Sequence, residues 1–135
     1  MAWADFIKCT GSGDCIGAEK DDCVIGDDNG QPIDEEGGND KIIGKGGPDG
    51  IVGFLGNDDI DGGSGSDGIT GAPRADKMVG GDGDDAIVHR FNLPERTLPD
   101  RSKDVIDCCV GNNVALINAS VDHDMAVNYE ILHTG

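Results

Sequence analysis

GGSGSDGIT at residues 62–70 and GGDGDDAIV at residues 80–88 are two of eight consecutive nonapeptides that fill residues 17–88. The other six read GAEKDDCVI, GDDNGQPID, EEGGNDKII, GKGGPDGIV, GFLGNDDID and GAPRADKMV. The sixth position is Gln31 in one unit and Asp in the rest: Asp22, Asp40, Asp49, Asp58, Asp67, Asp76 and Asp85. The eighth is always apolar: Val24, Ile33, Ile42, Ile51, Ile60, Ile69, Met78 and Ile87. A period this regular, with no insertion, predicts a stack of equivalent units.

Each unit divides into a turn of six residues and a strand of three. Glycine permits backbone angles that are closed to other residues, so the turn can bend sharply and aim its carbonyl groups at one point. The Asp that ends the turn adds a carboxylate, and carbonyl and carboxylate oxygens are the ligands that calcium prefers. We expect the apolar eighth position to point inward, where only stacked copies can bury it.

The units at 62–70 and 80–88 match the pattern G-G-x-G-x-D-x-U-x at every specified place. Residues 17–88 thus resemble the calcium-binding nonapeptide array of the repeats-in-toxin (RTX), or hemolysin-type, family, and residues 99–107 resemble one further degenerate unit. The resemblance implies an all-β fold, a right-handed parallel β-roll. This is a β-solenoid with two nonapeptides per coil, in which each unit pairs with the unit eighteen residues away. It also implies several bound Ca²⁺ ions and a fold that depends on them.

The flanks extend the resemblance. I-x-C and C-x-G precede the array and DVIDC follows it, as in small secreted bacterial β-roll proteins. We therefore expect a secreted, extracellular protein, with a cleaved leader that the start Met replaces. The formal net charge of −17 makes nucleic acid a poor partner. No apolar run approaches the roughly 20 residues of a membrane span, so we expect no direct membrane insertion.

The same charge predicts how the chain folds. Strands of neighbouring coils lie about 4.8 Å apart, which brings sixth-position carboxylates close together. Two unit charges at that separation repel by about 3 kcal/mol at an effective dielectric near 20. Burying one Ile side chain contributes a similar amount, about 1.5–3 kcal/mol. A divalent ion between coils would turn this repulsion into attraction, so calcium binding and folding should be one event.

Alternate units place their turns on opposite edges of the solenoid. We call the edge with GDDNGQ, GKGGPD, GGSGSD and GGDGDD the even edge, and the edge with GAEKDD, EEGGND, GFLGND and GAPRAD the odd edge. The best calcium sites are predicted on the even edge, at Asp49/Asp67 and Asp67/Asp85. The turn residues expected to contribute there are Gly44, Gly46, Gly62, Ser64, Gly80 and Asp82.

The odd edge offers Asp22, Asp40, Asp58 and Asp76 as candidate ligands. Lys20 and Arg74 replace the fourth glycine in two of its turns, and their charges could take the place of a metal. The alternative for this edge is a set of Asp–backbone hydrogen bonds without an ion.

Both ends depart from the repeat, as the ends of a stack should. Residues 1–16 are expected to form an N-terminal cap, with Trp3, Phe6 and Ile7 over the first coil. Residues 89–98 read as a protruding, solvated basic loop, with a partner site as the alternative. Residues 99–135 combine the degenerate repeat, with Asp104 and Ile106 in positions six and eight, and a C-terminal cap. The whole chain forms one structural domain.

Five cysteines indicate an oxidising compartment. Cys9 and Cys15 flank a Gly-rich turn and are expected to form a disulfide, whereas Cys23 holds an outward seventh position. Cys108 and Cys109 are adjacent, and a bridge between neighbours is strained. The odd count leaves at least one thiol free unless two chains pair, so we expect a monomer, with a cysteine-linked dimer as the alternative. No Cys-x-x-Cys or His-x-x-x-His spacing supports zinc.

Catalysis finds no support, because His89, His123 and His133 lack a spaced nucleophile or carboxylate partner. The sequence therefore predicts a non-catalytic extracellular calcium-binding module; its protein or polysaccharide partner stays open. The alternative is a calcium-stiffened adhesion or ice-binding module. Ice binding on a solenoid needs a flat ladder of Thr, which the outward seventh and ninth positions do not supply.

Overall fold

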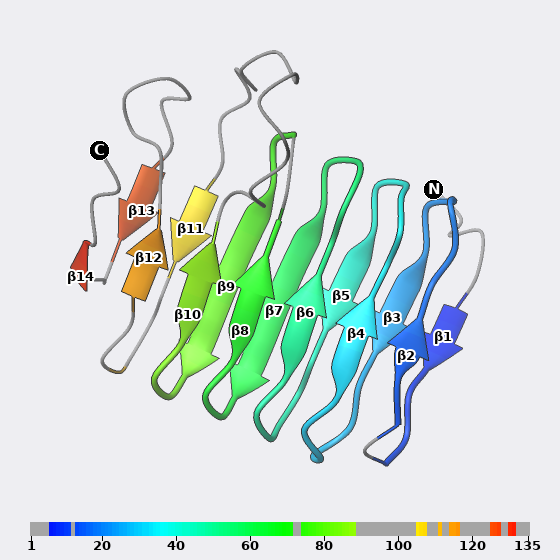
Figure 1. The fold of residues 1–135 in the computed structure, drawn as a ribbon, viewed down its shortest axis with the longest axis horizontal. Helices are drawn as coiled ribbons and strands as arrows, with labels where there is room; N and C mark the ends of the chain where they lie inside the picture. The colour runs from blue at the N-terminus through cyan, green and yellow to red at the C-terminus, as the bar shows by residue number, and fades with distance from the viewer. Residues whose placement is uncertain are drawn as a thin grey trace.

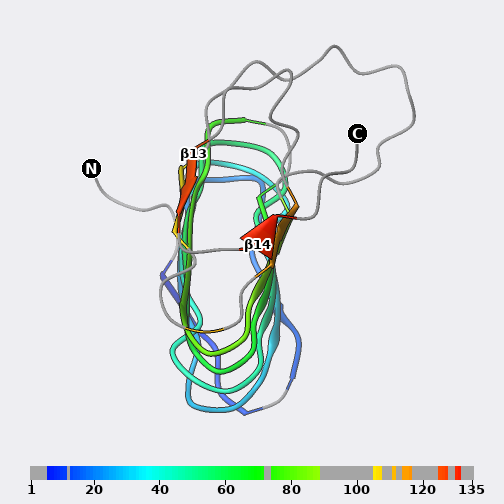
Figure 2. The same cartoon turned by 90° about the vertical axis from the view of Figure 1, so that its left-hand side faces the viewer.

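Two parallel β-sheets face each other and are joined by turns at both edges, so the chain winds into a β-solenoid (Figure 1). The computed structural model describes residues 6–11, 13–71, 74–88, 105–107, 111, 114–116, 125–127 and 130–131. Seen from one end of the stack, each coil is a flattened loop (Figure 2). Its long sides are the sheets and its narrow ends are the turns. The all-β, parallel solenoid predicted from the repeat is confirmed. None of the described residues form a helix that could cross a membrane.

Odd-numbered strands form one sheet and even-numbered strands form the other. The odd sheet runs in the order β1 (Phe6–Lys8), β3 (Cys23–Ile25), β5 (Lys41–Ile43), β7 (Asp59–Ser64), β9 (Lys77–Asp82), β11 (Val105–Asp107) and β13 (Met125–Val127). The even sheet contains β2 (Cys15–Ile16), β4 (Pro32–Asp34), β6 (Gly50–Val52), β8 (Gly68–Thr70), β10 (Ala86–Val88), β12 (Val114–Leu116) and β14 (Glu130–Ile131).

The pairing register follows the predicted period. Ile42 lies beside Ile60 and Ile51 lies beside Ile69, so equivalent positions stack every eighteen residues. Beyond the array the register changes, because Met78 pairs with Ile106. That pairing adds ten residues to the period, the length of the predicted loop at 89–98, which lies outside the described residues. The strands after it continue both sheets, and the C-terminal cap assignment stays a prediction.

The core is a double column of eighth-position side chains. Those of the array and Ile106 are at most 1% exposed: Val24, Ile33, Ile42, Ile51, Ile60, Ile69, Met78, Ile87 and Ile106. Each three-residue strand contributes one inward side chain, since successive residues of a strand point to opposite faces. Truncating such an Ile to Ala would cost about 2–5 kcal/mol. Because the core is so thin, we expect the interactions of the buried carboxylates in the turns to decide the stability of the fold.

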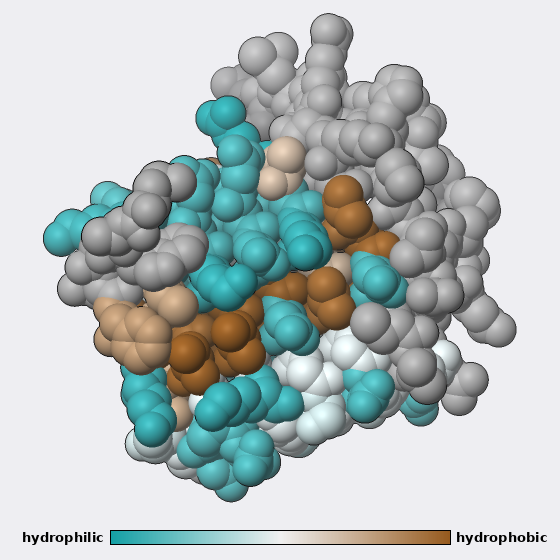
Figure 3. Space-filling view, turned by 180° about the vertical axis from the view of Figure 1, so that it is seen from behind, coloured by the Kyte–Doolittle hydropathy of each residue, from teal (hydrophilic) through white to brown (hydrophobic). Residues whose placement is uncertain are grey.

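The outer face of the odd sheet carries charged and apolar positions side by side. Its seventh positions alternate in charge at Lys41, Asp59 and Lys77, and Lys41 Nζ lies 3.5 Å from Asp59 Oδ2. A band of hydrophobic surface crosses this face (Figure 3), and the half-buried ninth positions Ile25 and Ile43 belong to this sheet. The seventh and ninth positions of the array hold a single Thr, so the outer faces carry no threonine ladder for ice.

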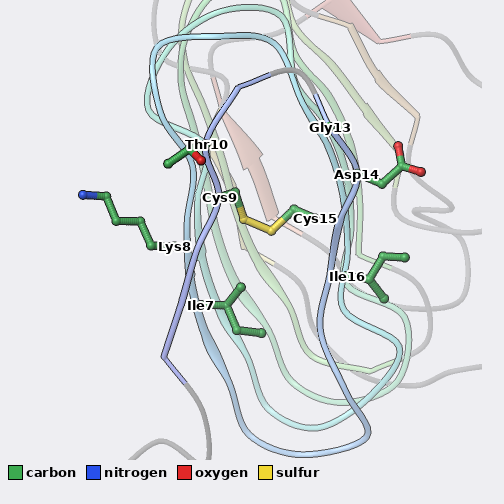
Figure 4. Close-up of a pocket in the computed structure, with 8 residues that line it drawn as sticks. All are labelled: Ile7, Lys8, Cys9, Thr10, Gly13, Asp14, Cys15 and Ile16. Atoms are coloured by element: carbon green, nitrogen blue, oxygen red, sulfur yellow. A yellow bond between two sulfur atoms is a disulfide. The ribbon is translucent and has the colours of Figure 1, made fainter.

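Strands β1 and β2 belong to the first coil, and Ile7 of β1 points into it and packs on the core (Figure 4). Phe6 is 68% exposed, so its predicted role over the first coil is wrong. Phe6 stands on the outward side of the strand, one residue before the inward position. Trp3 lies outside the described residues.

The predicted disulfide between Cys9 and Cys15 is confirmed, and it crosses the inside of this coil (Figure 4). It borders a pocket of about 300 Å³ at the end of the stack. Cys23 is a free thiol in an outward column, yet it is only 6% exposed between its neighbours Phe6 and Lys41. Cys108 and Cys109 lie outside the described residues.

Substitutions at two glycines, Gly56 and Gly50, test how closely successive coils are packed. Gly56 has φ 134°, and a Cβ there would overlap the carbonyl oxygen of Gly38 in the previous coil, whereas a Cβ at Gly50 would meet open space. Gly56→Ala should lower the free energy of unfolding by more than about 1 kcal/mol, because alanine is strained at this φ. Gly50→Ala should leave it unchanged or raise it by up to about 1 kcal/mol. Urea denaturation in saturating calcium measures both. Equal effects of the two substitutions would contradict the stacking.

Candidate metal centre

Sixth-position side chains form a buried column along each edge of the solenoid. Asp49, Asp67 and Asp85 lie on the even edge at 2–3% exposure. The odd edge carries Asp22, Asp40, Asp58 and Asp76 at 0–2% exposure. Buried carboxylates are rare unless they are paired or bind a metal, so both columns are candidate sites. The structure therefore brings together along each edge the aspartates that the repeat singles out.

A hydrogen bond to one carboxylate oxygen joins successive coils at Asp40, Asp49, Asp58, Asp67, Asp76 and Asp85. Asp67 Oδ1 accepts a hydrogen bond of 2.9 Å from the backbone N–H of Asp49, and Asp85 Oδ1 accepts one of 2.9 Å from Asp67. The odd edge repeats the pattern, since Asp58 Oδ1 accepts from the N–H of Asp40 at 2.9 Å. Asp–backbone hydrogen bonds, considered above as the metal-free alternative for the odd edge, thus occur on both edges. They do not distinguish the edges.

In several of these aspartates, the second carboxylate oxygen, Oδ2, lacks the hydrogen bond that Oδ1 has. Oδ2 of Asp40, Asp49, Asp58 and Asp67 is buried and has no hydrogen-bond partner among the described residues. A buried polar atom left in this way costs about 1–3 kcal/mol. A bound cation would remove that cost.

The position of Oδ2 also explains the first glycine of the turn. A Cβ on Gly44 would lie 2.5 Å from Oδ2 of Asp49, and one on Gly62 would lie 2.5 Å from Oδ2 of Asp67. The carboxylate oxygen occupies the space that a side chain would need. Backbone freedom, the reason given from the sequence, is therefore not the only reason for glycine in these turns.

Burial sets the ionisation of the columns. Burial raises the pKa of Asp49 to about 6, against the lowering effect of the Gln31 N–H hydrogen bond, and the charge of Asp67 adds to the rise. Burial likewise raises the pKa of Asp58 to about 7 and that of Asp40 to about 6. The pKa of Asp67 is raised by burial and by the charges of Asp85 and Asp61. Without a cation these carboxyl groups resist ionisation, and a divalent ion would supply the compensating charge.

Backbone carbonyl oxygens lie near the even-edge carboxylates, because a Cβ on Gly62 would lie 2.7 Å from the carbonyl oxygen of Gly80 and 2.5 Å from Oδ2 of Asp67. Strands β7 and β9 run on into the turns, where Gly63 pairs with Gly81 and Ser64 with Asp82, and Gly46 bridges to Ser64. Carbonyl oxygens stacked next to carboxylates suit Ca²⁺, which takes six to eight oxygen ligands. Gly44, Gly62 and Gly80 are buried in these turns, whereas the side chains of Ser64 and Asp82 are exposed.

The odd edge differs at its fifth position. Asn39 N–H donates to Asp21 Oδ1 at 2.8 Å, and Asn57 N–H donates to Asn39 Oδ1 at 2.9 Å. This second ladder links the odd turns without a cation. Lys20 and Arg74 are exposed, so the expectation that their charges take the place of a metal finds no support in the structure.

The first even-edge turn is held by an amide. Gln31 Nε2 donates to the carbonyl oxygen of Gly11 at 2.7 Å and to Asp27 Oδ1 at 2.5 Å. Asp27 Oδ2 also accepts from the N–H of Gly11 at 2.7 Å, and hydrogen bonds from Gly11 and Asn29 lower the pKa of Asp27. A neutral donor thus joins the first two coils where a carboxylate would repel its neighbours. The signal in the sequence was Gln31 as the exception at the sixth position.

Sequence reasoning missed Glu35. It holds the first position of the turn EEGGND, where the other units have Gly, and its side chain is completely buried. Burial raises the pKa of Glu35 to about 8, and the charges of Asp40 and Asp22 add to the rise. The signal was again a departure from the repeat, an acid in a place reserved for glycine.

A solenoid of two parallel sheets, with one apolar side chain per strand and a buried carboxylate ending the turns, defines the class of nonapeptide β-solenoids. The family model of the RTX calcium-binding nonapeptide repeat (four copies) matches residues 36–69 and 69–88. Residues 36–88 therefore match RTX-type repeats, which confirms over these residues the resemblance seen in the sequence. No curated protein and no solved structure is similar enough to count as a match. Gln31 and Glu35 both precede the matched residues.

Protonation of the buried carboxylates should partly replace calcium in stabilising the folded form. The folded-state pKa values of Asp40, Asp49 and Asp58 lie above the ordinary 3.8, so protonation favours the folded form. This contribution is complete below the unfolded-state pKa and is lost as the pH rises through about 6 and 7. In excess chelator, lowering the pH from about 8 to about 5 should increase the β signal in circular dichroism.

At a pH of about 5 the protein is close to its isoelectric point of about 4.1, where low net charge promotes association. Sedimentation at micromolar concentration must therefore show a monomer, so that the β signal reports folding and not aggregation. A β signal that stays constant or falls on acidification would contradict the assignment. In saturating calcium the same acidification should weaken the fold, since protons compete with the ion for the carboxylates.

Proposed function

We propose that this protein is an extracellular calcium-binding β-roll module whose folding is coupled to calcium binding and which catalyses no reaction. The observation that carries the proposal is that the buried Oδ2 atoms of Asp49 and Asp67 lack hydrogen-bond partners among the described residues and lie near backbone carbonyl oxygens of the next coil. The match of residues 36–88 to RTX calcium-binding repeats supports calcium as the ion.

We place the principal ions on the even edge, one between Asp49 and Asp67 and one between Asp67 and Asp85. Asp67 would face both ions. Gly44, Gly46, Gly62, Ser64 and Gly80 would offer backbone oxygens, and Asp82 stands at the exposed end of its turn. The hydrogen bonds through Oδ1 fix each carboxylate, so Oδ2 is the oxygen free to take up an ion at Asp49 and Asp67.

The coupling of calcium binding to folding rests on a balance between the free energy of apolar burial and the cost of burying charge. Each added coil buries two apolar side chains and two carboxylates. The apolar burial contributes about 1.5–3 kcal/mol per Ile. Burying unpaired charge and ordering many glycines oppose it. Because the site exists only in the folded stack, calcium binding energy becomes folding energy.

The compartment follows from the disulfide and the family. RTX repeat proteins are typically secreted, and the bridge between Cys9 and Cys15 suits an oxidising environment. Calcium outside cells is abundant enough to fill sites with dissociation constants of about 10⁻⁴–10⁻³ M, which are typical of extracellular modules. The chain would therefore fold after export.

Calcium removal tests the coupling. The chelated protein should lose most of its β signal in circular dichroism at neutral pH, and added Ca²⁺ should restore it cooperatively. Mg²⁺ should substitute poorly, because it demands a smaller octahedral site and keeps its waters. A chain that is equally folded in excess chelator at neutral pH would rule out the coupling.

Two aspartate substitutions test the placement of the ions. Asp67→Ala should raise the calcium midpoint of folding more than Asp76→Ala, because Asp67 would serve two ions and the odd edge has its own fifth-position ladder. The pair is matched, since each substitution removes one charge and one 2.9 Å hydrogen bond to the previous coil. Calcium titrations followed by circular dichroism give the midpoints. Equal midpoints would mean that both edges bind calcium alike.

A further inference from the structure

Glu35 sends an acidic side chain into the interior of the odd edge. It opens the turn 35–40, and its carboxyl group reaches back to the turn 17–22 of the previous coil. A Cβ on Gly17 would overlap Glu35 Oε2, so the carboxylate fills the space that this glycine leaves. Neither oxygen of Glu35 has a hydrogen-bond partner among the described residues.

Two aspartates meet Glu35 there. One carboxylate oxygen each from Asp22, Glu35 and Asp40 lie within 4.8 Å of one another, and all three side chains are at most 1% exposed. Asp22 Oδ2 accepts from the N–H of Ala18 at 3.1 Å, and Asp40 Oδ1 accepts from the N–H of Asp22 at 2.8 Å. Asp40 Oδ2 has no such partner in the described part of the chain. Three ionised carboxylates this close repel one another unless a cation joins them.

We propose that Asp22, Glu35 and Asp40 bind one Ca²⁺ ion through their side-chain carboxylates. The ligand type favours calcium, because Ca²⁺ takes carboxylate oxygens in flexible geometry, whereas Mg²⁺ demands a near-octahedral site. Mg²⁺ also keeps several waters, which so buried a cluster does not favour.

This site differs from the even-edge sites in its chemistry. Its third carboxylate comes from the first position of the turn, a position that supplies no side chain elsewhere in the array. The ion would join the turns at 17–22 and 35–40, just before the regular repeats. The site shares with the proposed function only the identity of the ion, and it does not depend on the ions at Asp49, Asp67 and Asp85.

Counting ions by native mass spectrometry of the full chain in calcium tests the proposal. Glu35→Gln and Glu35→Gly should each bind one Ca²⁺ fewer than the unsubstituted chain. Glu35→Gly gives the turn the residue that the other units carry, so it should still fold. Glu36→Gln is the matched control, because it removes the same charge from the adjacent, exposed residue and should keep the full number of ions.

An unchanged ion count in both Glu35 variants, with more β structure in chelator, would overturn the proposal and leave Glu35 as a buried neutral acid. If neither variant folds, a crystal structure of the unsubstituted chain grown with calcium decides the question by electron density between the three carboxylates. Absence of that density overturns the proposal. Asp67→Ala separates the two proposals, because it should lose even-edge ions and keep the ion at Glu35.

Discussion

The buried sixth-position carboxylate is the group on which the rest of this solenoid depends. Its Oδ1 accepts a backbone hydrogen bond from the coil before it, which fixes the register of eighteen residues. Its Oδ2 lies inside the turn, against the first glycine of the same unit. The same side chain therefore aligns the coils and introduces the charge that opposes their stacking. The proposed coupling of folding to calcium binding rests on the neutralisation of that charge.

In the nine-residue units with Asp at the sixth position, apolar burial favours stacking and the buried carboxylate opposes it. Three residues of strand allow one inward apolar side chain, so each coil sets two such side chains, worth about 1.5–3 kcal/mol each, against two buried carboxylates. Glycine predominates at the first and fourth residues of the turn, because the carboxylate occupies the space over the first and backbone atoms of the previous coil crowd the fourth. Glycine in the turn is thus a consequence of the buried carboxylate as much as of backbone geometry.

Much of the fold could be predicted from the sequence, because the repeat encodes it directly. The inward eighth position and the disulfide between Cys9 and Cys15 follow from the spacing of the residues, and the pairing over eighteen residues follows from the resemblance to the RTX array. Phe6 was misplaced because the repeat does not extend to it, so its face could not be counted. Glu35 was missed for another reason. Its role depends on the direction of its side chain, and spacing does not determine whether an acid in a glycine position points outward or into the previous coil.

The two ends of the array handle the carboxylates differently. At the N-terminal side, a disulfide spans the first coil and the Gln31 amide donates where a carboxylate stands in later turns. Residues 44–88 contain no such substitute in the turns of the even edge, where each unit ends in Asp with a Gly at its first position. These are also repeats that match the RTX model. Since interactions in a solenoid are made only with the neighbouring coils, each turn must balance its own charge. On the even edge, we therefore expect the proposed dependence on calcium to be local to the turns from Gly44 to Asp85, because the even-edge turn before them already has the neutral amide donor of Gln31.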